Sequence, residues 1–234
     1  MAMRIGTSGY NYPEWRGSFY PDKFPASKML PYYAARFSTV EINYTFYRMP
    51  TAKIVASWDA ETPDGFCFAL KAPRRITHDA RLKDVDEPLR YFLDTARALG
   101  PKLGPILFQL PPNFKKDLSR LGDLLARLPA DLCYAFEFRH ASWHAGDLYE
   151  QLERRNAALC IADSDKSTTP LVATADFGYL RLRDEGYSEG ALAEWGRKVT
   201  QLGAPWRDAY VYFKHEESGI GPILAGQFRA LVTG

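Results

Sequence analysis

The chain has 234 residues, of which 46% are hydrophobic and 25% charged, and its formal net charge is +2. This composition is typical of a globular protein that buries a sizeable core, and it excludes a disordered chain. The near-neutral charge excludes the overall basic character of a general nucleic-acid-binding protein, so any cationic surface must be local.

The apolar runs and the cysteines favour an intracellular protein without membrane contact. No segment approaches the roughly 18 consecutive apolar residues of a membrane span, and no secretory leader opens the sequence. Cys67, Cys133 and Cys160 lie in apolar runs and form no Cys-x-x-Cys pair. We therefore expect buried free thiols and a cytoplasmic protein.

Short apolar runs alternate with helical patterns along the chain, which predicts a parallel sheet built from successive βα units. Eight runs are predicted as strands, at residues 3–8, 39–43, 66–71, 105–110, 133–138, 158–163, 177–182 and 209–214. Helices are predicted between them, with Thr51 as an N-cap, Gly100 as a stop signal and leucines at helical spacing from Leu118 onward. A further helix contains Trp195, and the last one follows the eighth run.

Eight strands favour closure of the sheet into a barrel. No Gly/Ser-rich linker or low-complexity tract divides the sequence, so we predict one domain spanning residues 1–234. An open doubly wound sheet is the alternative, but residues 6–10 lack the G-x-G-x-x-G spacing of its phosphate-binding turn. The predicted fold is an α/β protein, a parallel (β/α)8 TIM-type barrel with irregular parts, whose working site lies at the C-terminal mouth.

The alternation of side chains along a strand decides which polar residues point into the barrel. In the fifth run, Tyr134 and Phe136 face the helices, so Glu137 and Arg139 point inward together. The same count places further polar side chains inside, mostly late in their strands, where barrels carry functional residues: Glu41, Asn43, Lys71, Gln109, Asp163, Arg181 and Lys214.

The inward set contains three carboxylates and four basic side chains, so its local charge is positive. Buried charges destabilise a protein unless they are paired and hydrogen-bonded, so we expect most of them to form a network across the mouth. A basic side chain that is left without a carboxylate partner would then bind an anionic ligand. For any single residue of this set, the alternative is a purely structural role, in which its hydrogen bonds and ion pairs only pair the other members of the network.

Aromatic side chains and histidines in the loops extend the predicted ligand surface. Tyr47 and Trp143 follow strands and suit stacking on a sugar or a base. They equally suit a structural role in which they close loops onto the barrel. His78 and His140 also follow strands and are candidate ligand-binding residues.

The remaining signals concern bound anions and metals. Gly219 and Gly221 stand at the start of the last predicted helix, where barrels frequently bind phosphate through backbone N–H groups. His140 and His144 are spaced i, i+4, but no second carboxylate accompanies them at ligand spacing, so we predict no metal. Without a nucleotide fingerprint, we predict no cofactor.

A series of motifs spans nearly the whole chain: Gly6-Thr7-Ser8-Gly9-Tyr10, Trp15 with Phe19-Tyr20-Pro21, Glu41-Ile42-Asn43 with Thr45-Phe46-Tyr47, Lys71 with Thr77-His78, Gln109-Leu110-Pro111-Pro112, and Glu137-Phe138-Arg139 with Ser142-Trp143. This series resembles the YecE-like family, also called domain of unknown function 72. The resemblance implies a TIM-type barrel with a shared mouth, and a distant likeness to barrel enzymes of the endonuclease IV and sugar isomerase kind.

Two segments depart from the commoner pattern of that family. The sequence has Arg181-Leu182-Arg183-Asp184 where many members have Arg-x-His-Gly, and Phe213-Lys214-His215-Glu216 where many have Phe-Asn-Asn. The last two loops are therefore expected to recognise a different ligand.

The leading functional hypothesis is a metal-independent, phosphodiesterase-like hydrolase or lyase that acts on an anionic or phosphate-containing ligand. In this hypothesis Glu41 or Glu137 is the general base. A glycoside hydrolase is one alternative, because paired carboxylates and aromatic platforms also suit sugars. The surplus of basic side chains argues against a neutral sugar.

The basic side chains of the mouth have two roles in the leading hypothesis. Lys71 and Arg139 stabilise developing negative charge, while Arg181 and Lys214 bind phosphate. Whether the protein is an enzyme at all stays open at this point.

The other alternative is a nucleic-acid-binding or repair-associated protein without catalysis. Its phosphate contacts would be Arg74, Arg75, Lys115 and Lys116, with the aromatic side chains as stacking surfaces. An anionic small molecule or a nucleic acid is therefore the expected partner.

Overall fold

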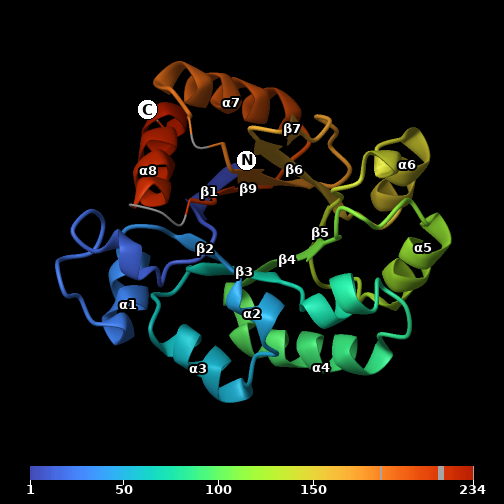
Figure 1. Ribbon diagram of the computed structural model, residues 1–234, viewed down its shortest axis with the longest axis horizontal. Helices are drawn as coiled ribbons and strands as arrows, with labels where there is room; N and C mark the ends of the chain where they lie inside the picture. Colours follow the sequence, from blue (N-terminus) through green and yellow to red (C-terminus); the bar gives the residue numbers. More distant parts are fainter. Residues whose placement is uncertain (185, 216–218, 234) are drawn as a thin grey trace.

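All eight predicted strands are present in the computed structural model, which describes residues 1–184, 186–215 and 219–233. They are β1 (Ala2–Thr7), β2 (Thr39–Ile42), β3 (Cys67–Lys71), β4 (Leu103–Gln109), β5 (Tyr134–Glu137), β6 (Ala158–Ser164), β8 (Phe177–Leu182) and β9 (Asp208–Phe213). They pair in parallel in the order β1-β9-β8-β6-β5-β4-β3-β2 and curve into a nearly closed barrel (Figure 1). A short strand that was not predicted, β7 (Ser167–Thr168), pairs antiparallel with the end of β6.

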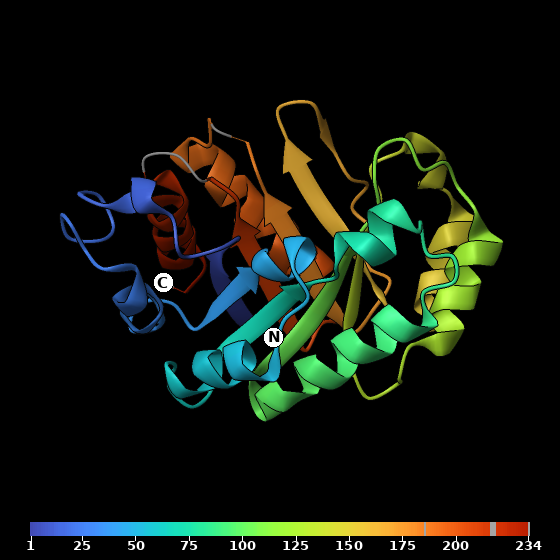
Figure 2. The ribbon, with the colours of Figure 1, turned by 60° about the horizontal axis from the view of Figure 1, so that its bottom comes forward.

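Helices surround the barrel on its outside, as Figure 2 shows, except for the short helix at Tyr44–Tyr47, which lies at the C-terminal end of β3. They are α1 (Met29–Ala34), α2 (Tyr44–Tyr47), α3 (Ala52–Ala60), α4 (Asp86–Ala96), α5 (Leu118–Arg127), α6 (Gly146–Glu153), α7 (Glu189–Leu202) and α8 (Ile220–Thr233), with short helical turns at η1 (Pro13–Trp15), η2 (Ala26–Lys28), η3 (Arg75–Asp79), η4 (Arg97–Lys102) and η5 (Ala141–Trp143). The predicted cap of α3 is confirmed, because Thr51 Oγ1 accepts a hydrogen bond from the Ile54 N–H (3.3 Å). Asp117 caps α5 in the same way, and the leucines of α5 turn their buried side toward the barrel.

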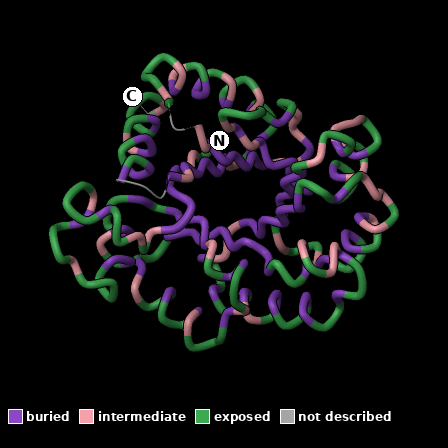
Figure 3. The backbone as a smooth tube through the Cα atoms, viewed as in Figure 1, coloured by how far each residue is buried: buried purple, intermediate pink, exposed green. Residues whose placement is uncertain are grey.

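The barrel interior is filled by small side chains on one wall and by large aromatic side chains on the other. The buried inward residues are Cys67, Ala69, Leu107, Ala135, Ala158, Cys160, Phe177, Tyr179, Tyr210 and Tyr212. Their neighbours along the strands, such as Phe68, Phe136 and Val211, pack against the helices. The predicted alternation is thereby confirmed for these strands, and Figure 3 shows the ring of buried backbone that results.

The cysteines are placed differently from one another. Cys67 and Cys160 are buried free thiols, as expected, but Cys133 is exposed, so the burial predicted for it is wrong. Cys133 directly precedes β5 and lies outside the buried part of that strand. No helix among the described residues is long and apolar enough to cross a membrane.

The barrel closes between β1 and β2, where a regular ladder is replaced by two local links. One is a parallel bridge between Ser8 and Glu41. The other is the hydroxyl of Tyr33 on α1, which accepts a hydrogen bond from the Thr7 N–H (2.9 Å) and donates one to the Thr39 C=O (3.0 Å). Tyr33 thus satisfies two buried backbone groups at the seam of the barrel.

We predict that Tyr33→Phe destabilises the protein, because the Thr7 N–H and the Thr39 C=O then lose a buried partner. The expected loss is about 1–3 kcal/mol in the free energy of unfolding, measured by urea denaturation. Tyr134→Phe is the matched control, since the buried Tyr134 hydroxyl has no hydrogen-bond partner in the described part of the chain. The control should be as stable as the wild type or more so, and equal losses in both variants would contradict this account of closure.

Candidate functional site

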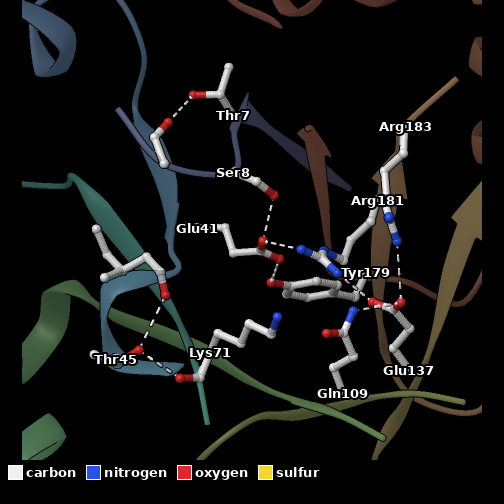
Figure 4. A network of polar contacts seen from close by, with 12 residues as sticks. Thr7, Ser8, Glu41, Thr45, Lys71, Gln109, Glu137, Tyr179, Arg181 and Arg183 are labelled. Atoms are coloured by element: carbon white, nitrogen blue, oxygen red, sulfur yellow. Dashed lines mark hydrogen bonds and ion pairs between the residues drawn. The ribbon is translucent and has the colours of Figure 1, made fainter. Parts of the chain in front are cut away.

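The polar centre of the barrel is a guanidinium held between two carboxylates (Figure 4). Arg181 on β8 donates from Nη1 to Glu137 Oε2 (2.5 Å) and from Nη2 to Glu41 Oε1 (2.9 Å). Each of the three side chains is at most 1% exposed. Buried charges destabilise a fold unless they are paired, so each member depends on the others. We call Arg181, Glu41 and Glu137 the arginine clamp.

Glu41 accepts two further hydrogen bonds. Ser8 Oγ, just after β1, donates to Oε1 (2.5 Å), and the Tyr179 hydroxyl on β8 donates to Oε2 (2.6 Å). Burial, together with the charge of Glu41, raises the pKa of Tyr179 well above its ordinary value, so this hydroxyl keeps the proton that it donates. Both oxygens of Glu41 are therefore occupied.

Glu137 has the more cationic surroundings. Its Oε1 accepts hydrogen bonds from Gln109 Nε2 (2.8 Å) and Arg139 Nε (2.9 Å), and Arg183 Nη1 lies 3.7 Å away. Burial alone would raise the pKa of Glu137, but Arg181 and Arg139 outweigh it and hold the pKa well below its ordinary value. Glu137 therefore stays charged at neutral pH and is a weak base.

Lys71 ends β3 and points toward the arginine clamp (Figure 4). Its Nζ lies 3.8 Å from the centre of the Phe46 ring on α2, and it forms no ion pair within the described residues. Thr45 holds α2 in this position, because its Oγ1 donates to the Lys71 C=O (2.6 Å). Burial and, next, the charge of Arg181 lower the pKa of Lys71 to about 7. A large fraction of this amine is therefore uncharged at neutral pH.

His78 packs against the edge of the same aromatic ring. The rings of His78 and Phe46 are 4.9 Å apart in an edge-to-face arrangement, and His78 Nδ1 lies 2.9 Å from Thr77 Oγ1. Burial, Lys71 and Arg139 lower the pKa of His78 to about 4. His78 is therefore neutral near pH 7 and adds no charge to the mouth.

A pocket of about 700 Å³ opens at the mouth beside Glu137, between the ends of β5, β6 and β7. Arg139 and Arg183 line it, with side chains that are 33% and 26% exposed. Around the arginine clamp, three guanidiniums face two carboxylates, which leaves one surplus positive charge. The surplus lies on these two partly exposed arginines, and the other two charged residues that line the pocket, Asp163 and Lys166, have opposite signs, so the pocket suits an anion.

The structure brings six of the predicted site residues together: Glu41, Lys71, Gln109, Glu137, Arg139 and Arg181. They come from the C-terminal ends of five different strands, as expected for a barrel mouth. Five of them form one hydrogen-bonded network and Lys71 points toward it, which supports the predicted inward orientation of each.

Asp163 lies outside this network, so its predicted inward orientation is wrong. It shares the alternation of Leu159 and Ile161, which pack against the helices. Its Oδ2 accepts hydrogen bonds from the Tyr187 hydroxyl (2.5 Å) and from Trp195 Nε1 on α7 (3.2 Å). Asp163 therefore links β6 to the α7 side of the barrel, and it also lines the pocket at the mouth.

The predicted loop residues are also scattered. Trp143 is fully buried and donates to the Phe114 C=O (2.7 Å), so the stacking surface predicted for it is wrong. Asn43 follows the end of β2 and lines a separate pocket outside the barrel, so its inward orientation is wrong as well. Tyr47 is exposed on α2, and His140 uses Nδ1 to accept a hydrogen bond from a backbone N–H at the start of η5. Ligand binding by these last two stays a prediction.

The segment after β9 is described in part. Lys214 directly follows the strand and is half-buried. Gly219 has a φ of +72° and packs so closely against the loop after β1 that a Cβ there would lie 2.1 Å from Ser18 Oγ. Gly221 stands in the first turn of α8, while Glu216 lies outside the described residues. Phosphate binding by this turn and by Lys214 stays a prediction.

Three residues of the site are absent from the sequence prediction: Ser8, Tyr179 and Arg183. Tyr179 has the same parity as Arg181, so the alternation along that strand was sufficient to find it. Arg183 continues the same parity one residue beyond the end of β8, as Arg139 does two residues beyond the end of β5, so extending the alternation past the strand would have found it as well. Among the residues with described positions, no three His, Cys, Asp or Glu side chains gather closely enough to hold a metal ion.

The sequence matches the family described as protein of unknown function DUF72 over residues 4–234. The UPF0759 protein YecE of Escherichia coli K12 is 32% identical over 166 residues, which cover 68% of this chain and 58% of that protein. The match thus spans less than two thirds of the length of this relative. The UPF0759 protein YunF of Bacillus subtilis is also 32% identical, over 92% of this chain and 89% of that protein.

Solved structures with the same architecture include a DUF72 family protein from Thermotoga maritima, with a TM-score of 0.85 and 26% identity over all of both chains. D-psicose 3-epimerase from Clostridium cellulolyticum has a TM-score of 0.55 and 13% identity, over 99% of this chain and 97% of its own. At that identity the epimerase shows the fold alone. The predicted TIM-type barrel is confirmed by both comparisons.

We predict that Arg181→Met destabilises the protein by about 3–5 kcal/mol at neutral pH, because Glu41 and Glu137 then stay buried without their shared cation. The loss should shrink as the pH falls toward about 4, since the unpaired carboxylates then take up protons in the folded state. Urea denaturation across this pH range measures both effects. Arg97→Met, which breaks an exposed ion pair with Asp131, should change the stability little. A loss no larger than that of Arg97→Met would contradict the role of the clamp.

We also predict that Lys71→Met stabilises the protein at neutral pH. The pKa of Lys71 is about 7 in the folded state against an ordinary 10.5, so the wild type loses stability as the pH falls from 10.5 toward 7. Methionine carries no such cost, and the gain should be about 1–4 kcal/mol near neutrality and vanish in strong base. Thermal and urea unfolding measure the gain.

The matched control for this substitution is Lys102→Met, which changes the other buried lysine. Lys102 Nζ donates to the Asp59 and Thr62 C=O groups (2.7 and 2.8 Å), so its loss leaves buried acceptors unpaired and should destabilise the fold. If both variants lose stability to the same extent, the lowered pKa of Lys71 is refuted.

Proposed function

The chain belongs to the DUF72 family, and from this premise we propose that the barrel mouth is the active site of a hydrolase or lyase that acts on an anionic small molecule. Arg139 and Arg183 bind the carboxylate or phosphate of the substrate in the pocket that they line. Lys71 is the reactive base. The observation that carries the proposal is a buried lysine amine that lies against the Phe46 ring without an ion pair among the described residues, beside a mouth with surplus positive charge. Burial and Arg181 lower the pKa of this amine, a combination typical of catalytic lysines.

The arginine clamp has a positioning role in this proposal. Both terminal nitrogens of Arg181 are bonded to carboxylates, so the phosphate-binding role that the sequence hypothesis gave it passes to Arg139 and Arg183. Glu137 is too weak a base for proton abstraction, since its pKa lies well below the ordinary value. It instead orients Arg139, whose Nε it binds while the rest of the guanidinium faces the pocket.

Proton transfer in this site starts from Lys71. Lys71 is largely buried with its amine against the Phe46 ring, and this burial lowers the pKa of Lys71, which favours the uncharged amine as a base toward a bound substrate. Arg139 and Arg183 stabilise the negative charge that develops when the substrate loses its proton. The charged form of Lys71 that results lies near Glu41 and Glu137, which stabilise it.

The two alternative functions have less support. A glycoside hydrolase needs room for a sugar between its two carboxyl groups, and here the Arg181 guanidinium lies between Glu41 and Glu137. A nucleic-acid-binding surface is weakened because Arg74, Arg75 and Lys116 form ion pairs with nearby carboxylates.

We predict that inorganic phosphate and malonate bind at the mouth and that Arg139→Gln and Arg183→Gln each weaken the affinity by roughly tenfold. Isothermal titration calorimetry measures the affinity. Arg207→Gln is the control, because Arg207 pairs with Asp176 at the opposite end of the barrel and should leave binding unchanged. Equal affinities in all variants would remove anion recognition from the proposal.

The activity itself is tested with an anion-exchange fraction of a bacterial metabolite extract, followed by mass spectrometry. The wild type should consume at least one anion, and Lys71→Met should not. The rate should rise with pH through about 7, because Lys71 loses its proton there and the free amine is the reactive form. Equal consumption by Lys71→Met, or a rate that falls across this range, would contradict the assigned base.

A further inference from the structure

Two lysines are buried in the described part of the chain, and their amines have different contacts. Lys102 Nζ donates to the Asp59 and Thr62 C=O groups and lies 2.9 Å from Asp59 Oδ1. Lys71 Nζ lies over the Phe46 ring and forms no hydrogen bond or ion pair with a described residue. Lys102 is therefore a structural cation, whereas the amine of Lys71 is free to react.

The neighbours of Lys71 leave its lone pair unused. Glu41 and Glu137 each accept hydrogen bonds from Arg181 and from at least two other side chains, so neither depends on Lys71 as a donor. The nearby guanidinium of Arg181 disfavours a second positive charge. An amine that is desolvated beside another cation is a nucleophile toward carbonyl carbon.

We propose that Lys71 forms an imine with the substrate, which is therefore a carbonyl compound that also carries an anionic group. This inference rests on the function proposed above: it keeps the anionic substrate, adds a carbonyl group to it, and makes Lys71 a nucleophile in place of a proton-abstracting base. Lys71 Nζ bonds to the carbonyl carbon, the C–O bond breaks, and the oxygen leaves as water. One proton is taken up from solvent, so that the free amine and the carbonyl compound give a protonated imine and one water molecule.

The surroundings of Lys71 suit each part of this step. Glu41 and Glu137 stabilise the positive charge of the protonated imine, and the face of the Phe46 ring, over which the amine lies, adds a cation–π contact. Arg139 lines the pocket and donates to Glu137 of the clamp, toward which Lys71 points, so an anionic group held by Arg139 lies at the same mouth as the amine. The protonated imine withdraws electrons from the bond next to the former carbonyl carbon, so cleavage of that bond, the reaction of a lyase, is the chemistry that it favours.

The test is reductive trapping with sodium borohydride in the presence of pyruvate, glyoxylate or dihydroxyacetone phosphate. Hydride reduces the imine to a stable secondary amine, and peptide mass mapping locates it. At least one probe should label Lys71 roughly tenfold faster than Lys102 or the exposed Lys115, and Lys71→Met should abolish the fast phase. Lys102→Met should leave the fast phase unchanged.

The outcomes separate this inference from the function on which it rests. If Lys71 in the wild type labels no faster than Lys102 with all three probes, the imine is refuted, while phosphate and malonate binding at the mouth is unaffected. If neutral glycolaldehyde labels Lys71 as fast as the anionic probes do, the imine stands and anion recognition by Arg139 and Arg183 fails. Because the mapping is done on wild-type protein, a folding defect in a variant cannot hide either result.

Discussion

The buried guanidinium of Arg181 between two carboxylates is the interaction on which the rest of the site depends. Its partners stand 140 and 44 positions earlier in the sequence, so the clamp joins β8 to β2 and β5 across the barrel. Removing three charges from water is costly, and good geometry at every contact is needed to offset it. The same contacts therefore hold the barrel together and decide which charges of the mouth stay free.

The arginine clamp determines which charged groups of the mouth remain available to a ligand. Because Arg181 neutralises the carboxylates from inside, Arg139 and Arg183 reach the pocket with positive charge to spare. For the same reason Lys71 has no carboxylate of its own, and burial leaves it largely uncharged. Buried charged and amine side chains such as these reduce stability, because apolar side chains would fill the same space more stably. Their presence in a well-packed barrel is therefore typical of a functional site.

Much of the barrel follows from the sequence, because apolar runs and strand alternation are local signals. Alternation was sufficient for Glu137 and Arg139, and it applied equally to Tyr179. It failed for Asn43, which lies beyond the end of β2, where the pleat no longer directs the side chain. The pairing within the clamp joins residues far apart in the chain, and no local pattern contains it. The seam depends likewise on Gly6, where a Cβ would lie 2.2 Å from the Thr39 carbonyl oxygen.

The most direct test of the central claim is an NMR titration of the Lys71 side-chain nitrogen, assigned by its loss in Lys71→Arg. The account predicts a midpoint near pH 7, because burial and Arg181 disfavour the charged amine. Lys102, which is bonded on several sides, serves as the internal comparison. A Lys71 amine that stays protonated up to its ordinary value near 10.5 would contradict the claim that the clamp leaves a reactive free base in the barrel mouth.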